Sequence, residues 1–140
     1  MIINLKRIQI QGVFNVKQYC LYNDIDLKAV TDLYCHDNQI SELKGLEELI
    51  NLKVLDCACN QLKELKGLDK LVNLEKLSCY GNQLTELNDV ENLINLKWLM
   101  CSNNQIRELT LKNLINLELL NYDNDKITEL KCKNESIVFI

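Results

Sequence analysis

The chain has 140 residues, of which 47% are apolar, enough for one domain with a hydrophobic core. No segment approaches the roughly 18 uninterrupted apolar residues of a membrane-spanning helix, so we expect no membrane association. The net charge is −4 with acidic and basic residues interspersed, which argues against a nucleic-acid-binding surface.

Seven cysteines are present, an odd number that leaves at least one unpaired in any disulfide scheme. The N-terminal segment MIINLKRIQIQG lacks the longer apolar run and the small-residue cleavage site of a signal peptide. Reduced thiols in a cytoplasmic location are therefore expected.

Residues 1–29 are expected to form a degenerate N-terminal coil that caps the domain. Within them NLKRIQI, at residues 4–10, resembles NLKVLDC at residues 51–57 and predicts a first strand. The stretch from Ile10 to Cys35 predicts a longer, irregular first turn. Its side chains Phe14, Tyr19 and Leu21 are expected to cover the open end of the core.

Residues 30–130 contain five repeats. Their blocks read VTDLYCHDNQISELKGLEELI, NLKVLDCACNQLKELKGLDKLV, NLEKLSCYGNQLTELNDVENLI, NLKWLMCSNNQIRELTLKNLI and NLELLNYDNDKITEL. Each fits LxxLx(C/L)xxNx(L/I)xxL, with Val30 leading the first block, and the fourth block is one residue short near Thr110. In the fifth block Tyr122 replaces the cysteine and Asp125 replaces the asparagine. Two residue types recur every 22 residues: Cys35, Cys57, Cys79 and Cys101, and Asn38, Asn60, Asn82 and Asn104.

Each repeat predicts a strand, a turn and a return segment. Alternating apolar residues, as in LKVLDC, predict a short parallel strand with one face inward. The asparagine then turns the chain, and its amide is expected to bond the backbone of neighbouring coils in a ladder. Apolar spacings of three and four, as in ELKGLEELINL, predict a short helix or 3₁₀ turn.

Residues 131–140 are expected to form a C-terminal cap strand. The run IVFI at 137–140 lies where a sixth strand would begin, because Ile140 follows Leu130 by ten residues. The cap is thin, and an exposed apolar face on a terminal repeat invites end-to-end association. Either the strand is shielded, or a partner or a second copy covers it.

The pattern of residues 30–130 resembles that of the leucine-rich-repeat family, and within it the 22-residue internalin-like class. The resemblance is specific, since five consecutive copies agree. It implies one α/β solenoid domain over residues 1–140, with a curved parallel β-sheet on the concave face and short helices or 3₁₀ turns on the convex face. Members of this family commonly bind proteins through the outward strand residues of the concave face.

The repeats arrange these outward residues in three columns. Trp98, the only tryptophan, has Leu119 and Phe139 as neighbours in its column, Met100 beside it and Tyr80 diagonal to it. Exposed aromatic and methionine clusters on a rigid scaffold are typical interface anchors. The columns are Arg7, Asp32, Val54, Lys76, Trp98, Leu119 and Phe139; Gln9, Tyr34, Asp56, Ser78, Met100 and Asn121; and Gln11, His36, Ala58, Tyr80, Ser102 and Asp123.

The N-terminal part of this candidate surface is more polar than the part around Trp98. Tyr34, His36 and Asp56 form its more polar, N-terminal part and are interpreted as a hydrophilic rim of the partner-binding site. The alternative is that Trp98 only packs against Lys76 and Met100, with no partner.

The repeated cysteines occupy the inward slot where the family usually has leucine. Cysteine packs well as a small hydrophobe, whereas a metal needs convergent ligands that a straight column does not supply. We therefore expect packing and no metal site. Cys59 is expected at the strand end, half exposed, while Cys20 and Cys132 lie in the caps.

Signals for catalysis are weak. His36 is the only histidine, and it has no partnered nucleophile. No glycine-rich phosphate loop, paired-carboxylate motif or Ser-His-Asp order is present. We expect no enzyme activity and no cofactor.

The sequence therefore predicts a non-enzymatic module that binds a protein partner through its concave surface. The chain is expected to be a monomer or a weak homodimer through its C-terminal edge. One alternative function is self-assembly through the C-terminal SIVFI strand. Another is a carbohydrate or small ligand stacked on Trp98 and Tyr80, although shallow arcs rarely enclose ligand-sized pockets.

Overall fold

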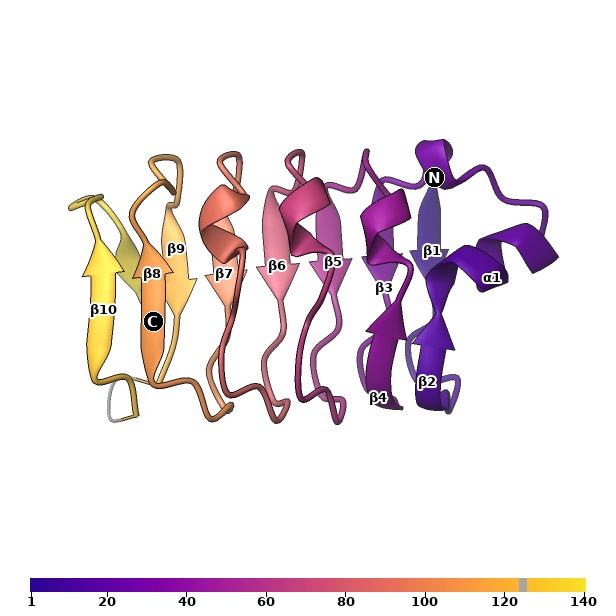
Figure 1. Cartoon of the computed structure of the whole chain (residues 1–140), viewed down its shortest axis with the longest axis horizontal. Coiled ribbons are helices and arrows are strands. Elements are labelled where there is room, and N and C mark those ends of the chain that lie inside the picture. Colours follow the sequence, from indigo (N-terminus) through magenta and orange to yellow (C-terminus); the bar gives the residue numbers. More distant parts are fainter. Residues whose placement is uncertain (124–125) are drawn as a thin grey trace.

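The protein is a solenoid of stacked coils, described here by a computed structural model of residues 1–123 and 126–140. Each coil passes once through a continuous sheet and returns along the opposite side, where the 3₁₀ turns lie (Figure 1). The predicted α/β leucine-rich-repeat architecture is confirmed, with parallel strands on the concave side and 3₁₀ turns on the convex side.

The concave side is a parallel sheet of seven strands in the order β1-β3-β5-β6-β7-β9-β11. Leu33, Leu55 and Leu77 are paired one above the next, and Leu99 and Leu120 continue the row. This common register follows from the repeat, because a constant period returns the same residue to the same height in every coil. The strands are β1 (Ile2–Asn4), β3 (Asp32–Tyr34), β5 (Val54–Asp56), β6 (Lys76–Ser78), β7 (Trp98–Met100), β9 (Leu119–Asn121) and β11 (Val138–Phe139).

The convex side carries 3₁₀ turns in the middle coils and short strand pairs towards both ends. A glycine in the left-handed conformation begins two of the turns, and at Gly45 an added Cβ would lie 2.9 Å from the Cβ of Lys17. Asp89 adopts the same conformation before η4, with φ of 63°. The elements are β2 (Gln11–Asn15) paired with β4 (Gln39–Lys44), β8 (Glu108–Leu111) paired with β10 (Glu129–Cys132), α1 (Val16–Tyr22), η1 (Leu27–Ala29), η2 (Leu46–Glu48), η3 (Leu68–Lys70) and η4 (Val90–Asn92).

Stacked leucines and cysteines form the core between the two sides. The four repeated cysteines are buried at one inward position, as the sequence predicted. The Sγ of Cys57 lies 3.4 Å from the carbonyl of Ser78 in the next coil, and Cys101 repeats this contact with Asn121 at 3.3 Å. Cys59 is exposed at the turn that follows β5, with a positive φ of 53°.

Two rows of asparagines join successive coils. Asn60 donates to the carbonyls of Cys35 and Cys57 at 3.0 Å each and accepts from the N–H of Ile40, so the predicted inner ladder is confirmed. The equivalent slot of the fifth repeat, Asp125, lies outside the described residues. A second, mostly exposed row was not predicted, although its spacing is visible in the sequence. Its members each donate to a carbonyl of the preceding coil: Asn51, Asn73, Asn95, Asn116 and Asn134.

The N-terminal coil differs from the prediction in its register. The first strand is β1, not residues 4–10, and Ile3 rather than Ile8 pairs with Leu33. Leu5 is buried beyond it, whereas 55% of Ile8 is exposed. Arg7, Gln9 and Gln11 therefore lie outside the columns, and Ile2, Asn4 and Lys6 take their places.

A helix, not an irregular turn, covers the N-terminal end of the core. Asn15 caps α1 by accepting from the N–H of Gln18, and the helix buries Val16 and Cys20. Phe14 is buried and meets the half-buried Tyr19 edge to face at 5.8 Å, as expected of covering residues. Leu21 does not share this role, since 65% of it is exposed.

The predicted sixth strand forms, but one residue out of the expected register. Val138, not Phe139, pairs with Leu119, and Phe139 pairs with Leu120. A shift of one residue turns a side chain to the other face of a sheet. Phe139 accordingly contacts Tyr122 of the cysteine slot edge to face, with ring centroids 5.8 Å apart.

Candidate binding surface

The outward residues of the central concave strands form the candidate site. Alternation along each strand sends the middle leucine inward and its two neighbours outward. We call these outward residues the concave surface: Asp32, Tyr34, Val54, Asp56, Lys76, Ser78, Trp98, Met100, Leu119 and Asn121.

A shallow hollow of about 180 Å³ lies on this surface across β3, β5, β6 and β7. Its walls include aromatic side chains and a methionine, residue types that are enriched in protein interfaces, beside one acidic and one basic side chain. Five residues predicted for the site line it together: Tyr34, Asp56, Lys76, Trp98 and Met100. Val54 and Ser78 also line it; both stood in the predicted columns but were not chosen as site residues. The inward Leu55 and Leu77 form the rest of the lining.

Trp98 is the largest side chain at the hollow, and 41% of it is exposed. The Nζ of Lys76, on the neighbouring strand, lies 3.9 Å from the centre of the indole ring. A cation in this position on an exposed ring contributes about 0.5–1 kcal/mol. The ring is therefore held in place without being buried. Leu119 follows Trp98 across the sheet and is half buried.

Tyr80 and His36 lie beside the hollow without lining it. The hydroxyl of Tyr80 accepts a hydrogen bond of 2.6 Å from the amide of Asn103. The two ring nitrogens of His36 lie 3.3 Å from Asp37 and 3.7 Å from Asp56. Most of the His36 side chain is covered, and the shorter of its two contacts is the one with Asp37.

Asp37 connects this polar part to the N-terminal coil. Its carboxylate accepts a hydrogen bond of 3.0 Å from Arg7, which, together with the His36 contact, lowers the pKa of Asp37. Arg7 is exposed and Asp37 is half buried, so this ion pair adds little to stability.

The structure does not bring Phe139 into the concave surface. Val138 stands beside Leu119 instead, and Phe139 lies at the C-terminal end of the core. Its proposed contribution to the partner site therefore loses its geometric basis.

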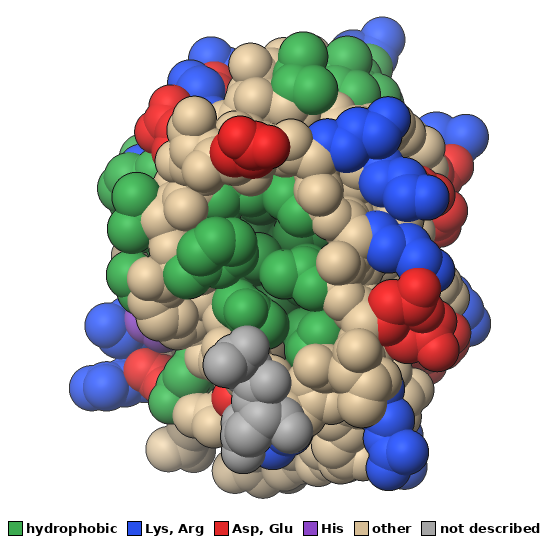
Figure 2. Space-filling view, turned by 90° about the vertical axis from the view of Figure 1, so that its left-hand side faces the viewer, with side chains coloured by type: hydrophobic (Ala, Val, Ile, Leu, Met, Phe, Trp, Pro, Cys, Tyr) green, Lys and Arg blue, Asp and Glu red, His purple; other side chains and the backbone are tan. Residues whose placement is uncertain are grey.

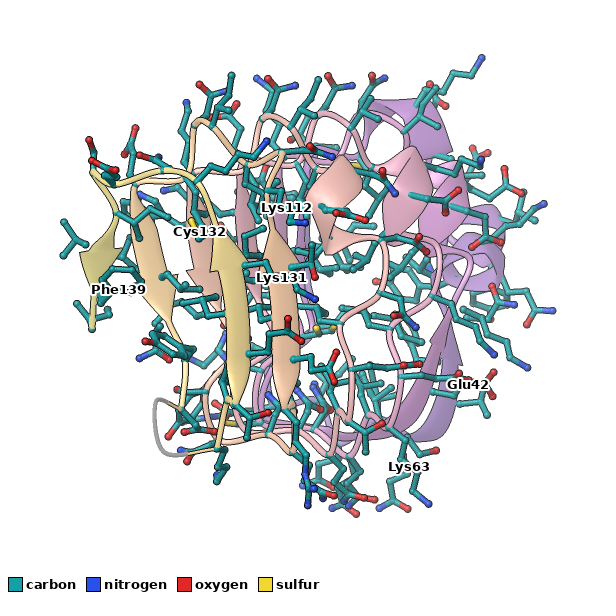
Figure 3. All side chains as sticks on the ribbon, turned by 60° about the vertical axis from the view of Figure 1, so that its left-hand side comes forward. Glu42, Lys63, Lys112, Lys131, Cys132 and Phe139 are labelled. Atoms are coloured by element: carbon teal, nitrogen blue, oxygen red, sulfur yellow. The ribbon has the colours of Figure 1, made fainter. Side chains whose placement is uncertain are left out.

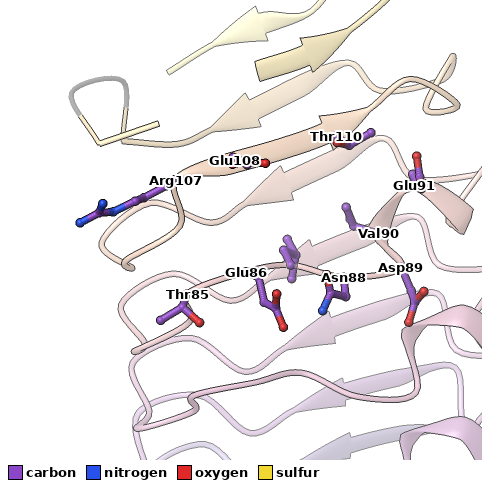
Figure 4. A pocket seen from close by; sticks show the side chains of 10 residues that line it. Thr85, Glu86, Asn88, Asp89, Val90, Glu91, Arg107, Glu108 and Thr110 are labelled. Carbon is purple, nitrogen blue, oxygen red and sulfur yellow. The ribbon is translucent and has the colours of Figure 1, made fainter. Parts of the chain in front are cut away.

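Larger hollows lie on the convex side, but they are charged. The one in Figure 4 has a volume of about 410 Å³ and lies between β8 and the segment before η4. Glu86, Asp89, Glu91 and Glu108 surround it, with Arg107 at one end. A second hollow of about 450 Å³, near Lys17 and Glu48, is also lined mainly by ionic side chains. Neither offers an aromatic anchor.

Residues 1–123 and 126–140 contain neither a membrane-spanning helix nor a cluster of metal-ligand side chains. No helix in that part of the chain is long and apolar enough to cross a membrane. Nor do three or more His, Cys, Asp or Glu side chains of those residues group as metal ligands do.

The family comparison agrees with the repeat geometry. The family model described as "Leucine Rich repeats (2 copies)" matches residues 28–70 and again residues 50–92. Residues 28–92 therefore match the leucine-rich-repeat family, and the coils on either side continue the same architecture. A comparison with curated protein sequences gave no match.

Solved internalin structures from Listeria monocytogenes resemble this leucine-rich-repeat protein. The functional domain of InlJ, described as including a cysteine ladder, is 29% identical with a TM-score of 0.64, over 79% of this chain and 26% of that one. Internalin InlF is 20% identical with a TM-score of 0.71, over 99% of this chain and 46% of that one. Internalin C2 is 22% identical with a TM-score of 0.66, over 99% of this chain and 69% of that one. The chain thus spans about a quarter of the first structure and under half of the second.

Proposed function

We propose that this leucine-rich-repeat protein is a non-enzymatic interaction module that binds a protein partner on its concave surface. The observation that carries the proposal is the half-exposed Trp98, held by Lys76 at a hollow that spans four strands. Aromatic residues at the centre of a rigid surface carry much of the binding energy in protein interfaces.

The form of the hollow favours a protein over a small ligand. Pockets for small molecules usually have about 300–1,000 Å³ and surround the ligand, whereas this one has about 180 Å³ on an open sheet. A protruding apolar side chain of a partner fits such a hollow against Trp98 and Met100. Asp56 and Lys76 supply one charge of each sign at its edges, which would select a partner with complementary charges.

A cytoplasmic location is part of the proposal. All seven cysteines, each within the described residues, are free thiols. Disulfides are rare in reducing compartments, and a protein with seven free thiols suits one.

The experiment compares Trp98→Ala with Asp69→Ala, a change on the convex η3 turn. Partners captured by the wild-type protein are identified and purified, and their affinities are measured by calorimetry. We expect Trp98→Ala to weaken binding by about 2 kcal/mol, roughly 30-fold, and Asp69→Ala to leave it unchanged. Binding retained in full by Trp98→Ala would refute the proposed site. If the wild-type protein bound a glycan and not a protein, and Trp98→Ala lost that binding, the carbohydrate alternative would hold.

Thermal melting and fluorescence keep this test interpretable. Because Trp98 points out of the core, its removal should barely change the melting temperature. Its emission in the free protein should resemble solvated indole, be quenched by acrylamide, and shift to the blue only with partner bound. Blue, unquenchable emission from the free protein would contradict the outward placement on which the site depends.

A further inference from the structure

The C-terminal end of the solenoid leaves its core open. Figure 2 shows a hydrophobic patch at the centre of this end, framed by backbone and polar side chains. Leu130 and Cys132 of β10 are only half buried, although the paired Leu109 and Leu111 of β8 are each 1% exposed. Phe139 is 53% exposed, whereas Leu120, its neighbour in the sheet, is fully buried. A further layer at this end would bury all three side chains.

Both outermost strands also have a free edge in the described structure. The N–H groups of Val138 and Ile140 donate to Glu118 and Leu120 of the neighbouring coil, at 2.9 and 3.1 Å. Backbone groups alternate in direction along a parallel strand, so the N–H of Phe139 points away from the sheet. Such edges are templates for pairing with another chain.

The N-terminal end is closed by comparison. Helix α1 covers the core there with Val16 and Cys20, which are fully buried. The edge strand β2 is interrupted by a bulge between Gly12 and Val13, a common protection against pairing. A head-to-tail stack of copies would have to displace these features, so a second copy fits best with its own C-terminal end against this one.

The charges of β10 are complementary to those of a second β10 strand paired antiparallel with it. Glu129 and Lys131 lie on the outward side, one residue before and one after Leu130, and their side chains are 2.8 Å apart. Antiparallel pairing centred on Leu130 would set Glu129 opposite Lys131 of the second copy, and the reverse on the other side. Opposite charges in facing positions stabilise a strand pair. Glu108 is the neighbour of Glu129 on β8, so a second cation beside Glu129 would offset the repulsion between the two carboxylates.

We propose that this end is a self-association surface, on which two copies join about a two-fold axis. The two edges lie on opposite sides of the core, β10 on the convex side and β11 on the concave side, as Figure 3 shows around Cys132 and Phe139. The axis would lie in the plane of the end face, perpendicular to the strands. Rotation about it pairs β10 of one copy with β10 of the other, and β11 with β11, and both pairs are antiparallel. The apolar patches then meet between the strand pairs. Such an isologous contact closes at two copies.

Charge reversal tests the proposal on the full chain. The wild-type protein should form dimers at rising concentration in analytical ultracentrifugation. E129K and K131E each place like charges opposite each other twice, and each should weaken dimerisation about tenfold or more. An equimolar mixture of the two variants should recover the association, because one then supplies only cations and the other only anions. The double variant E129K/K131E should recover it alone.

The matched controls carry the same charge changes elsewhere. E42K and K63E, far from this end (Figure 3), should dimerise as the wild type does. Trp98→Ala should also dimerise normally, so failure here and failure of the proposed partner site are distinguishable. Circular dichroism checks that each variant folds.

Three results would overturn the proposal. A wild-type chain that stays monomeric into the high micromolar range has no such surface. Open-ended filaments would show head-to-tail stacking. Weakened single variants whose mixture shows no recovery would refute the pairing centred on Leu130.

Discussion

Burial determines the chemistry of each cysteine in this protein. Removal from water raises the pKa of Cys35 and of Cys101 to about 12, and raises that of Cys57 and Cys79 well above the ordinary value. The thiolate is the form that attacks electrophiles and binds metals. At neutral pH these four side chains are therefore neutral packing groups.

Replacement of Cys79 tests this packing role. Cys79→Ser should lower the free energy of unfolding by about 1–3 kcal/mol, since it places a hydroxyl in a fully buried apolar slot. Cys79→Ala should cost less. Urea denaturation measures both, with the exposed Cys59→Ser as a control expected to change nothing. If neither Cys79 variant mattered while a chelator lowered the melting temperature, a metal site would replace the packing account.

At the scale of the coil, the two asparagine rows differ in burial and in bond number. Asn82 of the inner row is buried; it donates to the carbonyls of Cys57 and Cys79 and accepts from the N–H of Leu62. Asn95 of the outer row is exposed and donates to the carbonyl of Val72. Water can replace the outer bond but not the inner three, so the inner row holds the coils together.

Alanine substitutions should lower the free energy of unfolding more in the inner row than in the outer row. Asn82→Ala should destabilise the protein by about 1–3 kcal/mol for each buried backbone group left unsatisfied. Asn104→Ala should behave alike, because its amide repeats the same contacts. We expect Asn95→Ala to cost about 1 kcal/mol or less. Denaturant unfolding provides the values, and equal losses at Asn82 and Asn95 would contradict the role assigned to burial.

Across the whole molecule, stability depends on neighbouring coils. Each interior coil is covered on both sides, the first is covered by α1, and the last has a neighbour on one side only. In such a one-dimensional array, local opening begins where a neighbour is missing.

Hydrogen exchange should reveal this asymmetry at protein concentrations too low for self-association. Amides of β10 and β11 should exchange about tenfold faster or more than those of β5 and β6, since their opening exposes less surface. The strands β2 and β4, beside α1, should exchange more slowly than β10. Uniform protection along the chain, or faster exchange at the N-terminal end, would contradict the picture of a capped and an open end.

Much of the interior and part of the site were predictable from the sequence. A constant interval of 22 residues returns Cys35, Cys57 and Cys79 to one height, and strand alternation assigns each neighbour to the inside or the outside. For the same reason the outward positions of Tyr34 and Trp98 followed from the pattern alone. The period works where each coil has an identical neighbour above and below.

The tertiary structure decided the strand register at both ends of the solenoid, which the 22-residue period does not determine. Ile3 with Leu5, and Ile8 with Ile10, both alternate as a strand requires, and contact with Leu33 selected the first pair. At the other end, a one-residue difference in pairing turned Phe139 away from the concave surface. The contact of Lys76 with Trp98 likewise depends on side chains meeting across strands. The sequence by itself determined the repeat, the faces of its strands and the buried column, because these follow from local periodicity. Pairing at the ends and contacts between side chains depend on which surfaces meet in three dimensions, so only the folded chain decided them.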